Sequence, residues 1–176
     1  MANRQALRDL QSRLADRLQL ARTQGVAPSW LAVEAGGKNY LFPMAQAGEI
    51  FPWGATQAVP YTQNWFLGVA NLRGGLYGVV DLASYVTGQA MPPKTELARK
   101  ESRLVALNGA LDVNCALLID RLAGLRNQQA FSDFSEKSPE APVFFGHRYV
   151  DQNGQAWQEI NLQLLAQQAH FLTIGA

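Results

Sequence analysis

The sequence predicts a mainly β protein built from small barrels, with an amphipathic helix at each end of the chain. About nine or ten short runs of alternating apolar and small or polar residues predict strands. Turns that contain glycine or asparagine join several of these runs, as in β-hairpins. Helical patterns occur only at the two ends and at one junction in the middle, so the order of elements favours small barrels over a parallel sheet.

The composition limits the class of protein. With 176 residues, 48% hydrophobic and 16% charged, the chain suits one compact domain or two small subdomains that share a core. Its net charge of +1 is too balanced for a nucleic-acid or acidic-membrane partner. We find no signal peptide and no apolar run of about 18 residues. We therefore expect a cytoplasmic protein without direct membrane insertion, and the single cysteine, Cys115, suits a reducing compartment.

The first 25 residues predict an amphipathic helix, which we separate from a domain spanning residues 29–172. Gly25 and Pro28 mark the end of the helix. Its apolar stripe, with spacings of three and four, consists of Leu7, Leu10, Leu14, Leu18 and Ala21. Two interpretations stay open, because periodicity identifies a buried face but not what covers it. The stripe packs on its own domain, or it docks on another protein.

The first half of the domain predicts five strands and one helical turn. The expected strands are Trp30–Glu34, Asn39–Pro43, Ile50–Trp53 and the two arms of the stretch from Phe66 to Asp81. Gly36-Gly37 turns the first pair and Gly74-Gly75 the last. A helical turn from Leu82 to Val86 follows. The polar, proline-containing segment near 88–101 then reads as a connection between two subdomains.

The second half again predicts strands. Leu104–Leu107 leads to an Asn108-Gly109 turn and then to a strand with one apolar face, formed by Leu111, Val113, Cys115, Leu117 and Ile119. Cys115 lies on this face, so we interpret it as a small core residue. Leu122–Arg126 predicts a further short strand.

The last third of the domain predicts a loop, a hairpin and a closing helix. The polar segment 127–142 reads as an exposed loop anchored by Phe131 and Phe134. A hairpin follows, with arms His147–Val150 and Gln155–Gln158. The closing amphipathic helix would bury Leu162, Leu165, Ala169 and Leu172.

Catalytic chemistry has little support in the sequence. We find neither a phosphate-binding glycine loop nor a dinucleotide fingerprint, and expect no cofactor. The two histidines, His147 and His170, form no close ligand pair with Cys115, so we expect no metal site. A small β-barrel enzyme that uses Cys115 or His147 remains an alternative. We expect no catalytic residues.

Five short motifs carry a resemblance to a known family. Residues 68–74 read Gly-Val-Ala-Asn-Leu-Arg-Gly and residues 79–82 read Val-Val-Asp-Leu, while Glu49-Ile50, Val59-Pro60 and the Ala-Leu-Leu-Ile-Asp run of residues 116–120 stand in the corresponding order. Together they resemble the signature of the CheW-like chemotaxis coupling domain. The resemblance covers about residues 29–171.

The resemblance implies both a fold and a role. The fold would be two intertwined, five-stranded SH3-like β-barrels with a hydrophobic core between them. The role would be that of a non-catalytic adaptor. It would bind the regulatory domain of a CheA-like histidine kinase and the cytoplasmic tip of a methyl-accepting chemoreceptor, in arrays near the membrane. The short, nearly neutral chain with its leading helix further resembles the members of the family that control twitching motility through type IV pili.

We place the expected partner-binding site at one corner of the first barrel. Its candidate residues are Glu49, Ile50, Gly68, Val69, Asn71, Leu72, Arg73 and Gly74. We expect Arg73 to pair with Glu49 beside an apolar groove formed by Ile50, Val69 and Leu72. The pair would orient a partner, or it would only close the barrel.

Three further alternatives stay open. Gly68 either admits a partner closely or relieves crowding on its own strand. Phe51 and Trp53 are either core aromatics or an exposed anchor. The whole chain, finally, is an adaptor between receptor and kinase, or a stand-alone interaction module that assembles through its N-terminal helix.

Overall fold

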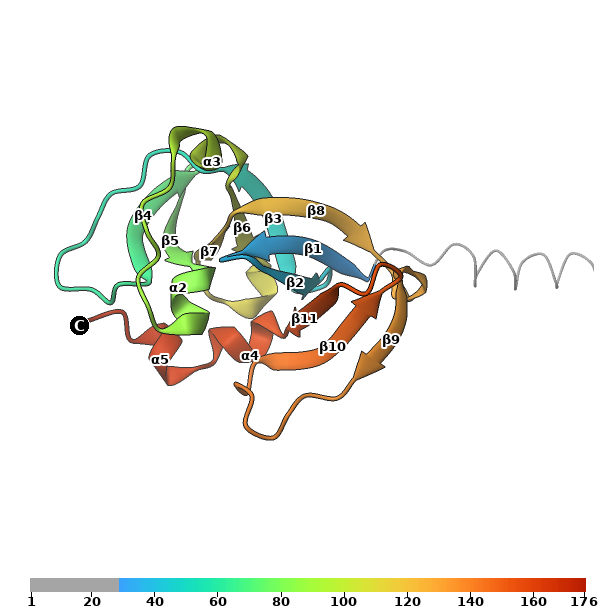
Figure 1. Cartoon of the computed structure of the whole chain (residues 1–176). Coiled ribbons are helices and arrows are strands. Elements are labelled where there is room, and N and C mark those ends of the chain that lie inside the picture. Colours follow the sequence, from blue (N-terminus) through green and yellow to red (C-terminus); the bar gives the residue numbers. More distant parts are fainter. Residues whose placement is uncertain (1–28) are drawn as a thin grey trace, which may run out of the picture.

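The computed structural model describes residues 29–176, and the helix expected within residues 1–25 lies outside the described part. Two curved sheets form the body of the protein (Figure 1). The six-stranded sheet has the spatial order β8-β1-β2-β11-β10-β9. Its strands are β1 (Trp30–Ala35), β2 (Lys38–Pro43), β8 (Arg121–Arg126), β9 (Phe131–Ser135), β10 (Phe145–Asp151) and β11 (Ala156–Ile160).

The second sheet has five strands in the order β3-β6-β7-β5-β4. They are β3 (Ala47–Pro52), β4 (Phe66–Leu72), β5 (Gly75–Asp81), β6 (Arg103–Leu107) and β7 (Cys115–Ile119). Only β5 with β7 and β2 with β11 pair in parallel, and the other neighbours are antiparallel. The mainly β fold with two sheets predicted from the sequence is confirmed, with six strands in one sheet where five were expected.

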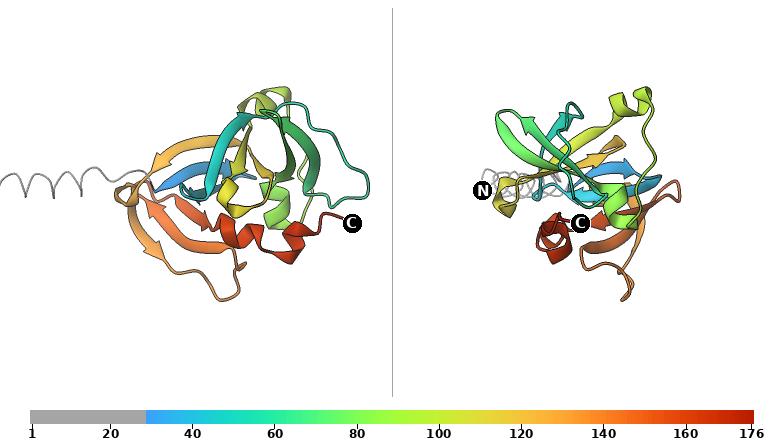
Figure 2. Two further views of the ribbon diagram at one scale, coloured as in Figure 1. Left: turned by 180° about the vertical axis from the view of Figure 1, so that it is seen from behind. Right: turned by 90° about the vertical axis from the view of Figure 1, so that its left-hand side faces the viewer.

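Within residues 29–176, four short α-helices accompany the sheets: α2 (Leu82–Thr87), α3 (Glu96–Glu101), α4 (Leu162–Ala166) and α5 (Ala169–Leu172). Single 3-10 turns lie at Gly109–Leu111 and Gln128–Ala130. Helix α2 is the expected helical turn after β5. The Asp81 carboxylate accepts the Ser84 N–H at its start, and Gly88 ends it in the left-handed conformation. Helices α4 and α5 run along one side of the two sheets, as the front and back views show (Figures 1 and 2).

Three apolar clusters hold the fold together. One lies inside the five-stranded sheet around Val79, Leu104 and Leu118, and a second lies inside the six-stranded sheet around Trp30, Leu41 and Trp157. The largest cluster joins the two sheets to α2, α4 and α5. Strand β7 is buried at all five positions, since its alternate side chains face two different clusters. The shared core therefore fixes each sheet against the other.

The segment 88–101 does not separate two subdomains. It links β5 to β6 within the five-stranded sheet, and it contains α3. The chain passes between the sheets at two other places, after β2 and between β7 and β8. Because strand pairing and not chain order defines a sheet, the polar composition of 88–101 marked an exposed connection and not a boundary.

Several local expectations are corrected by the structure. Leu111 and Val113 lie outside β7, because a 3-10 turn at Gly109–Leu111 replaces the expected two-residue hairpin. The expected loop over 127–142 contains the edge strand β9. The closing helix is interrupted between α4 and α5, and Phe171 is buried there in place of Leu172. The hairpins β1–β2 and β10–β11 form as predicted.

Candidate partner-binding site

The hairpin between β4 and β5 turns at Arg73 and Gly74, one residue earlier than expected. Leu72 pairs with Gly75, which leaves a two-residue loop. The φ angles of Arg73 (50°) and Gly74 (82°) are both positive, as a type I′ turn requires. The Asn71 side-chain oxygen accepts the Gly74 N–H at 2.8 Å and fixes the turn. Asn71, Arg73 and Gly74 thus act together to shape this corner.

The Arg73 side chain forms the expected ion pair with Glu49. Its Nη1 atom lies 2.6 Å from Glu49 Oε1, and the two side chains are 76% and 44% exposed. Glu49 belongs to β3 and Arg73 follows β4, the two edge strands of the five-stranded sheet. The pair therefore bridges the edges where the sheet curves round on itself. An ion pair this exposed contributes only about 0–1 kcal/mol to folding.

Gly68 is covered by the chain itself. Its φ is +130°, and a methyl group at this position would lie 2.0 Å from the Gln57 carbonyl oxygen. Two backbone hydrogen bonds between Gln57 and Val69, of 2.7 and 2.9 Å, hold the covering segment in place. The close approach that the glycine permits is therefore made by the loop between β3 and β4.

Val69 and Leu72 do not share an apolar groove with Ile50. Val69 packs against the core between the sheets, while Leu72 packs inside the five-stranded sheet. Their odd spacing on one strand places the two side chains on opposite faces. Ile50 remains 36% exposed beside Glu49. Of the candidate residues, the structure gathers Glu49, Asn71, Arg73 and Gly74 at the exposed corner, with Ile50 next to them.

Leu76 is an exposed residue that the sequence interpretation missed. It stands opposite Asn71 in the β4–β5 register and is 64% exposed. The signal was present in the alternation of β5, because Tyr77 and Val79 face the interior and Leu76 must then face outward. Leu76 therefore adds an exposed apolar side chain to the surface around Arg73.

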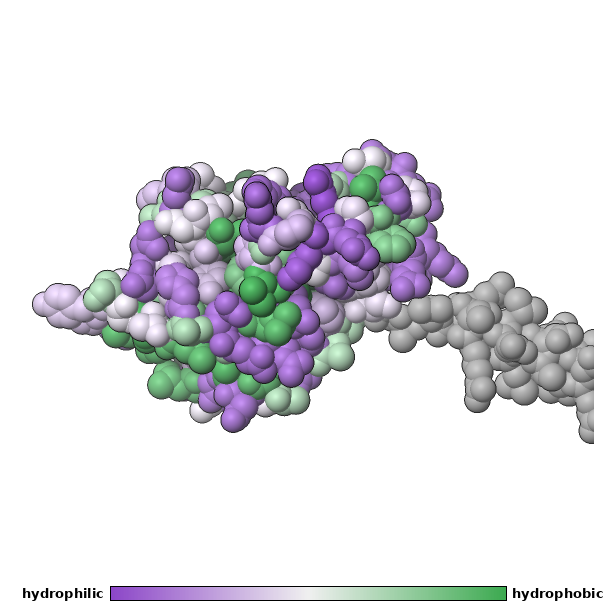
Figure 3. Space-filling view, turned by 90° about the horizontal axis from the view of Figure 1, so that it is seen from below, coloured by the Kyte–Doolittle hydropathy of each residue, from purple (hydrophilic) through white to green (hydrophobic). Residues whose placement is uncertain are grey.

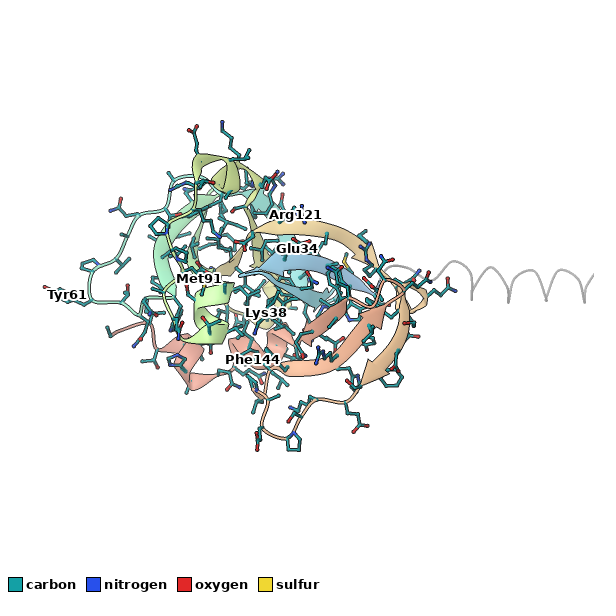
Figure 4. The ribbon with its side chains drawn as sticks, viewed as in Figure 1. Glu34, Lys38, Tyr61, Met91, Arg121 and Phe144 are labelled. Atoms are coloured by element: carbon teal, nitrogen blue, oxygen red, sulfur yellow. The ribbon has the colours of Figure 1, made fainter. Side chains whose placement is uncertain are left out.

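The loop between β3 and β4 supplies a second exposed element. Tyr61 projects away from the body at the far end of this loop (Figure 4) and is 91% exposed, with a φ of 59°. The C-terminal residues fasten the loop, because Gln63 N–H donates to the Ile174 carbonyl and Ala176 N–H donates to that of Tyr61, at 2.8 and 3.0 Å.

Phe51 and Trp53 are core aromatics. Both are half-buried and pack against the cluster inside the five-stranded sheet. The Phe51 ring contacts Tyr77 at a centroid distance of 6.5 Å. The Arg99 guanidinium covers the Trp53 ring at 4.4 Å, a cation–π contact. Neither aromatic is left free to serve as an exposed anchor.

The described residues give no support to nucleophilic or metal chemistry. Burial raises the pKa of the Cys115 thiol to about 12, so the thiolate that would act as a nucleophile is scarce near neutral pH. Across residues 29–176, no three His, Cys, Asp or Glu side chains gather into a possible metal site. Within the same range, no helix has the length and apolarity needed to cross a membrane.

The two sheets present an exposed charged corner at Arg73 and Glu49 and a protruding loop at Tyr61. A model of the CheW-like domain matches residues 29–169, and the chain belongs to the CheW-like domain family. It is thus an adaptor of the chemotaxis type.

Two of the proteins that are similar to this chain illustrate the relationship. Protein PilI of Pseudomonas aeruginosa is 28% identical over 160 residues, which cover 89% of this chain and 86% of PilI. This similarity confirms the subtype resemblance found in the sequence. The crystal structure of the scaffolding protein TtCheW from Thermoanaerobacter tengcongensis shares the fold, with a TM-score of 0.61 and 18% identity over 82% of this chain and 96% of that protein.

Proposed function

We propose that this protein is a non-catalytic adaptor that couples a chemoreceptor to a CheA-like histidine kinase in the cytoplasm. By similarity to PilI, the coupled system would control twitching motility through type IV pili, at receptor arrays near the membrane. The observation that carries the proposal is the exposed ion pair of Arg73 with Glu49, which is flanked by the exposed apolar residues Ile50 and Leu76.

The corner has properties that suit a partner-binding surface. Arginine is enriched at protein interfaces, and charge complementarity selects the partner and its orientation. The two-residue turn holds Arg73 in one backbone conformation before a partner arrives, which lowers the entropy lost on binding. Ile50 and Leu76 add apolar area that water would leave when a partner binds.

The remaining candidate residues would act indirectly. Gly68 and Val69 hold the loop between β3 and β4 against the sheet through their contacts with Gln57. Leu72 anchors the hairpin in the core of its sheet. We propose that these three residues position the corner, and that Glu49, Ile50, Asn71, Arg73 and Gly74 contact the partner.

Binding measurements with a matched ion-pair variant test the proposal. The full chain should retain both the regulatory domain of a CheA-like kinase and the cytoplasmic tip of a chemoreceptor in a pull-down. Arg73→Ala should weaken binding of at least one of them by about tenfold or more, equivalent to roughly 1.4 kcal/mol. The control is Arg121→Ala, because Arg121 forms a comparably exposed pair with Glu34 on the other sheet, at 2.8 Å (Figure 4).

The outcomes separate an interface role from a structural one. Equal binding by wild type and both variants, with a lower melting temperature for Arg73→Ala, would show that the Arg73 pair only closes the sheet. Weaker binding by both variants to the same degree would point to a general charge effect. Failure of the unmodified chain to retain either partner would contradict the adaptor proposal itself.

A further inference from the structure

An aromatic hollow lies on the edge of the six-stranded sheet, far from the corner described above. We use the term for the surface formed by Phe131, Phe134, His147 and Tyr149 on β9 and β10. It encloses about 340 Å³ and is also lined by Gln128, Ser132 and Asp133. Phe134 is 61% exposed and its ring lies 5.8 Å from His147 and 6.2 Å from Tyr149. Large exposed rings on an edge strand indicate a surface that another segment covers.

The described part of the chain begins beside this hollow. Strands β1 and β9 begin at the same end of the sheet (Figure 1) with Trp30 and Phe131, whose rings are 5.8 Å apart. Trp30 also contacts Tyr149 at 4.9 Å. If the helix predicted by the sequence ends near Thr23, the five residues 24–28 reach up to about 17 Å. A helix that ends near Thr23 could therefore reach the hollow through this linker.

The charges of the two segments are complementary. Residues 1–28 contain five arginines and two aspartates, a net charge of +3. The exposed stretch 131–140, which includes β9, contains three acidic residues and one lysine, a net charge of −2. Once the two segments are in contact, opposite charges that lie within the Debye length of about 8 Å attract one another at physiological salt. The apolar stripe of the first segment and the rings of the second supply the matching apolar contact.

The underside of the molecule also carries apolar side chains. Figure 3 shows this face, where apolar side chains gather in separate patches surrounded by polar ones. The aromatic hollow combines apolar area, the lining carboxylate of Asp133 and proximity to the start of the described chain.

We propose that the leucine stripe of residues 4–23 docks on the aromatic hollow of its own chain. The docked segment covers Phe134 and the outer edge of β9, and its arginines face the acidic residues of 131–140. The partner of this surface is thus an internal segment and not a receptor or kinase. The inference stands independently of the adaptor function, because it concerns a different sheet and a different surface.

Disulfide crosslinking in the full chain tests the docking. Ser132→Cys places a thiol on the rim of the hollow, and Gln11→Cys places another beside the stripe, four residues after Leu7 and three before Leu14. The matched control combines Ser132→Cys with Ser12→Cys, since position 12 is three or four residues from no member of the stripe. Cys115 does not interfere, because it is buried and its pKa is raised to about 12.

We expect the variant with Gln11→Cys and Ser132→Cys to form its intrachain disulfide at least about tenfold faster than the variant with Ser12→Cys and Ser132→Cys. The linker to the domain is the same in both variants, so its length cannot cause the difference. Adding Phe134→Ser should remove most of this difference. Equal rates for both pairs, or no crosslink, would overturn the proposal. A crosslinked dimer at micromolar concentration would overturn it as well, because the segment of a second copy would then occupy the hollow.

Discussion

At the scale of single residues, Arg73 combines a left-handed backbone with an exposed ion pair. A non-glycine residue in this conformation costs about 1–2 kcal/mol, which offsets the roughly 0–1 kcal/mol that the pair with Glu49 contributes. We therefore predict that Arg73→Gly is as stable as wild type or slightly more stable. Arg73→Ala should be less stable than Arg73→Gly, since alanine keeps the strain and loses the pair. Urea denaturation of the three proteins measures the order, and a glycine variant below the alanine variant would contradict it.

A second prediction at the scale of single residues concerns the reactivity of the Cys115 thiol. Its side chain is buried and its pKa is raised to about 12 by loss of solvation. The reactive thiolate is therefore scarce at pH 8, and burial also blocks access of a reagent. We predict that a disulfide reagent leaves the native protein unmodified and labels it fully in denaturant. Rapid labelling of the native protein would revive a nucleophilic role for Cys115.

At the scale of elements, the crossing of β4 by the loop between β3 and β4 depends on Gly68. Gly68→Ala would place a methyl group 2.0 Å from the Gln57 oxygen at a φ of +130°. We predict a loss of about 2–4 kcal/mol in the free energy of unfolding, in the range of severe backbone clashes. Gly54→Ala is the control, because no atom lies within 4 Å of its added methyl group. Thermal unfolding measures both, and equal stability of the two variants would refute the close crossing.

The turn between β10 and β11 should respond to acid. Asp151 accepts hydrogen bonds from Trp157 Nε1 at 3.0 Å and from the N–H groups of Gln155 and Asn153, both at 2.9 Å. These bonds, led by that of Trp157, hold the pKa of Asp151 below its ordinary value of 3.8. A lowered carboxyl pKa stabilises the fold above the unfolded-state pKa, and this contribution is lost as pH falls through the folded-state value.

We therefore predict that Asp151→Asn removes part of the acid sensitivity. Between about pH 6 and about pH 2, wild type should lose more unfolding free energy than the variant does. Urea denaturation at the two pH values provides the measurement. Equal losses in both proteins would show that the Asp151 hydrogen bonds carry no net stability.

The elements that the sequence predicted well are those set by local chemistry. The β1–β2 hairpin follows from Gly36-Gly37, and helix α2 follows from its Asp81 cap and Gly88 stop. The β7 strand was predicted too long, because the alternation of Leu111 and Val113 continued a pattern that a 3-10 turn interrupts. Only packing between distant segments decides where such a pattern ends.

The candidate site also contains some features that could be predicted from the sequence and others that could not. The pairing of Arg73 with Glu49 was expected from motifs that a known family shares, and the structure contains it. The cover over Gly68 was not predictable, since it depends on how the loop between β3 and β4 folds back over a strand. Opposite faces for Val69 and Leu72 followed from their spacing, so the expected groove could have been rejected from the sequence.

At the scale of the whole molecule, the two sheets depend on each other. The chain crosses from one sheet to the other after β2 and between β7 and β8, so the six-stranded sheet is made from two segments that flank the continuous segment of the five-stranded sheet. The largest apolar cluster contains side chains from both sheets, among them Val33, Leu117 and Ile160. A protein connected and packed in this way should unfold as one cooperative unit.

Leu117→Ala tests this cooperativity. Leu117 lies on β7, is fully buried and faces the core shared by the two sheets. Truncating it removes apolar contact and leaves a cavity, with an expected cost of about 2–5 kcal/mol. Because the core is shared, amide hydrogen exchange should accelerate equally in β1–β2 of one sheet and in β4–β5 of the other. Leu125→Ala, at a position 51% exposed on β8, should change stability by less than about 0.5 kcal/mol. Faster exchange confined to the five-stranded sheet would mean that the barrels unfold separately, and that the shared core joins them without coupling their stability.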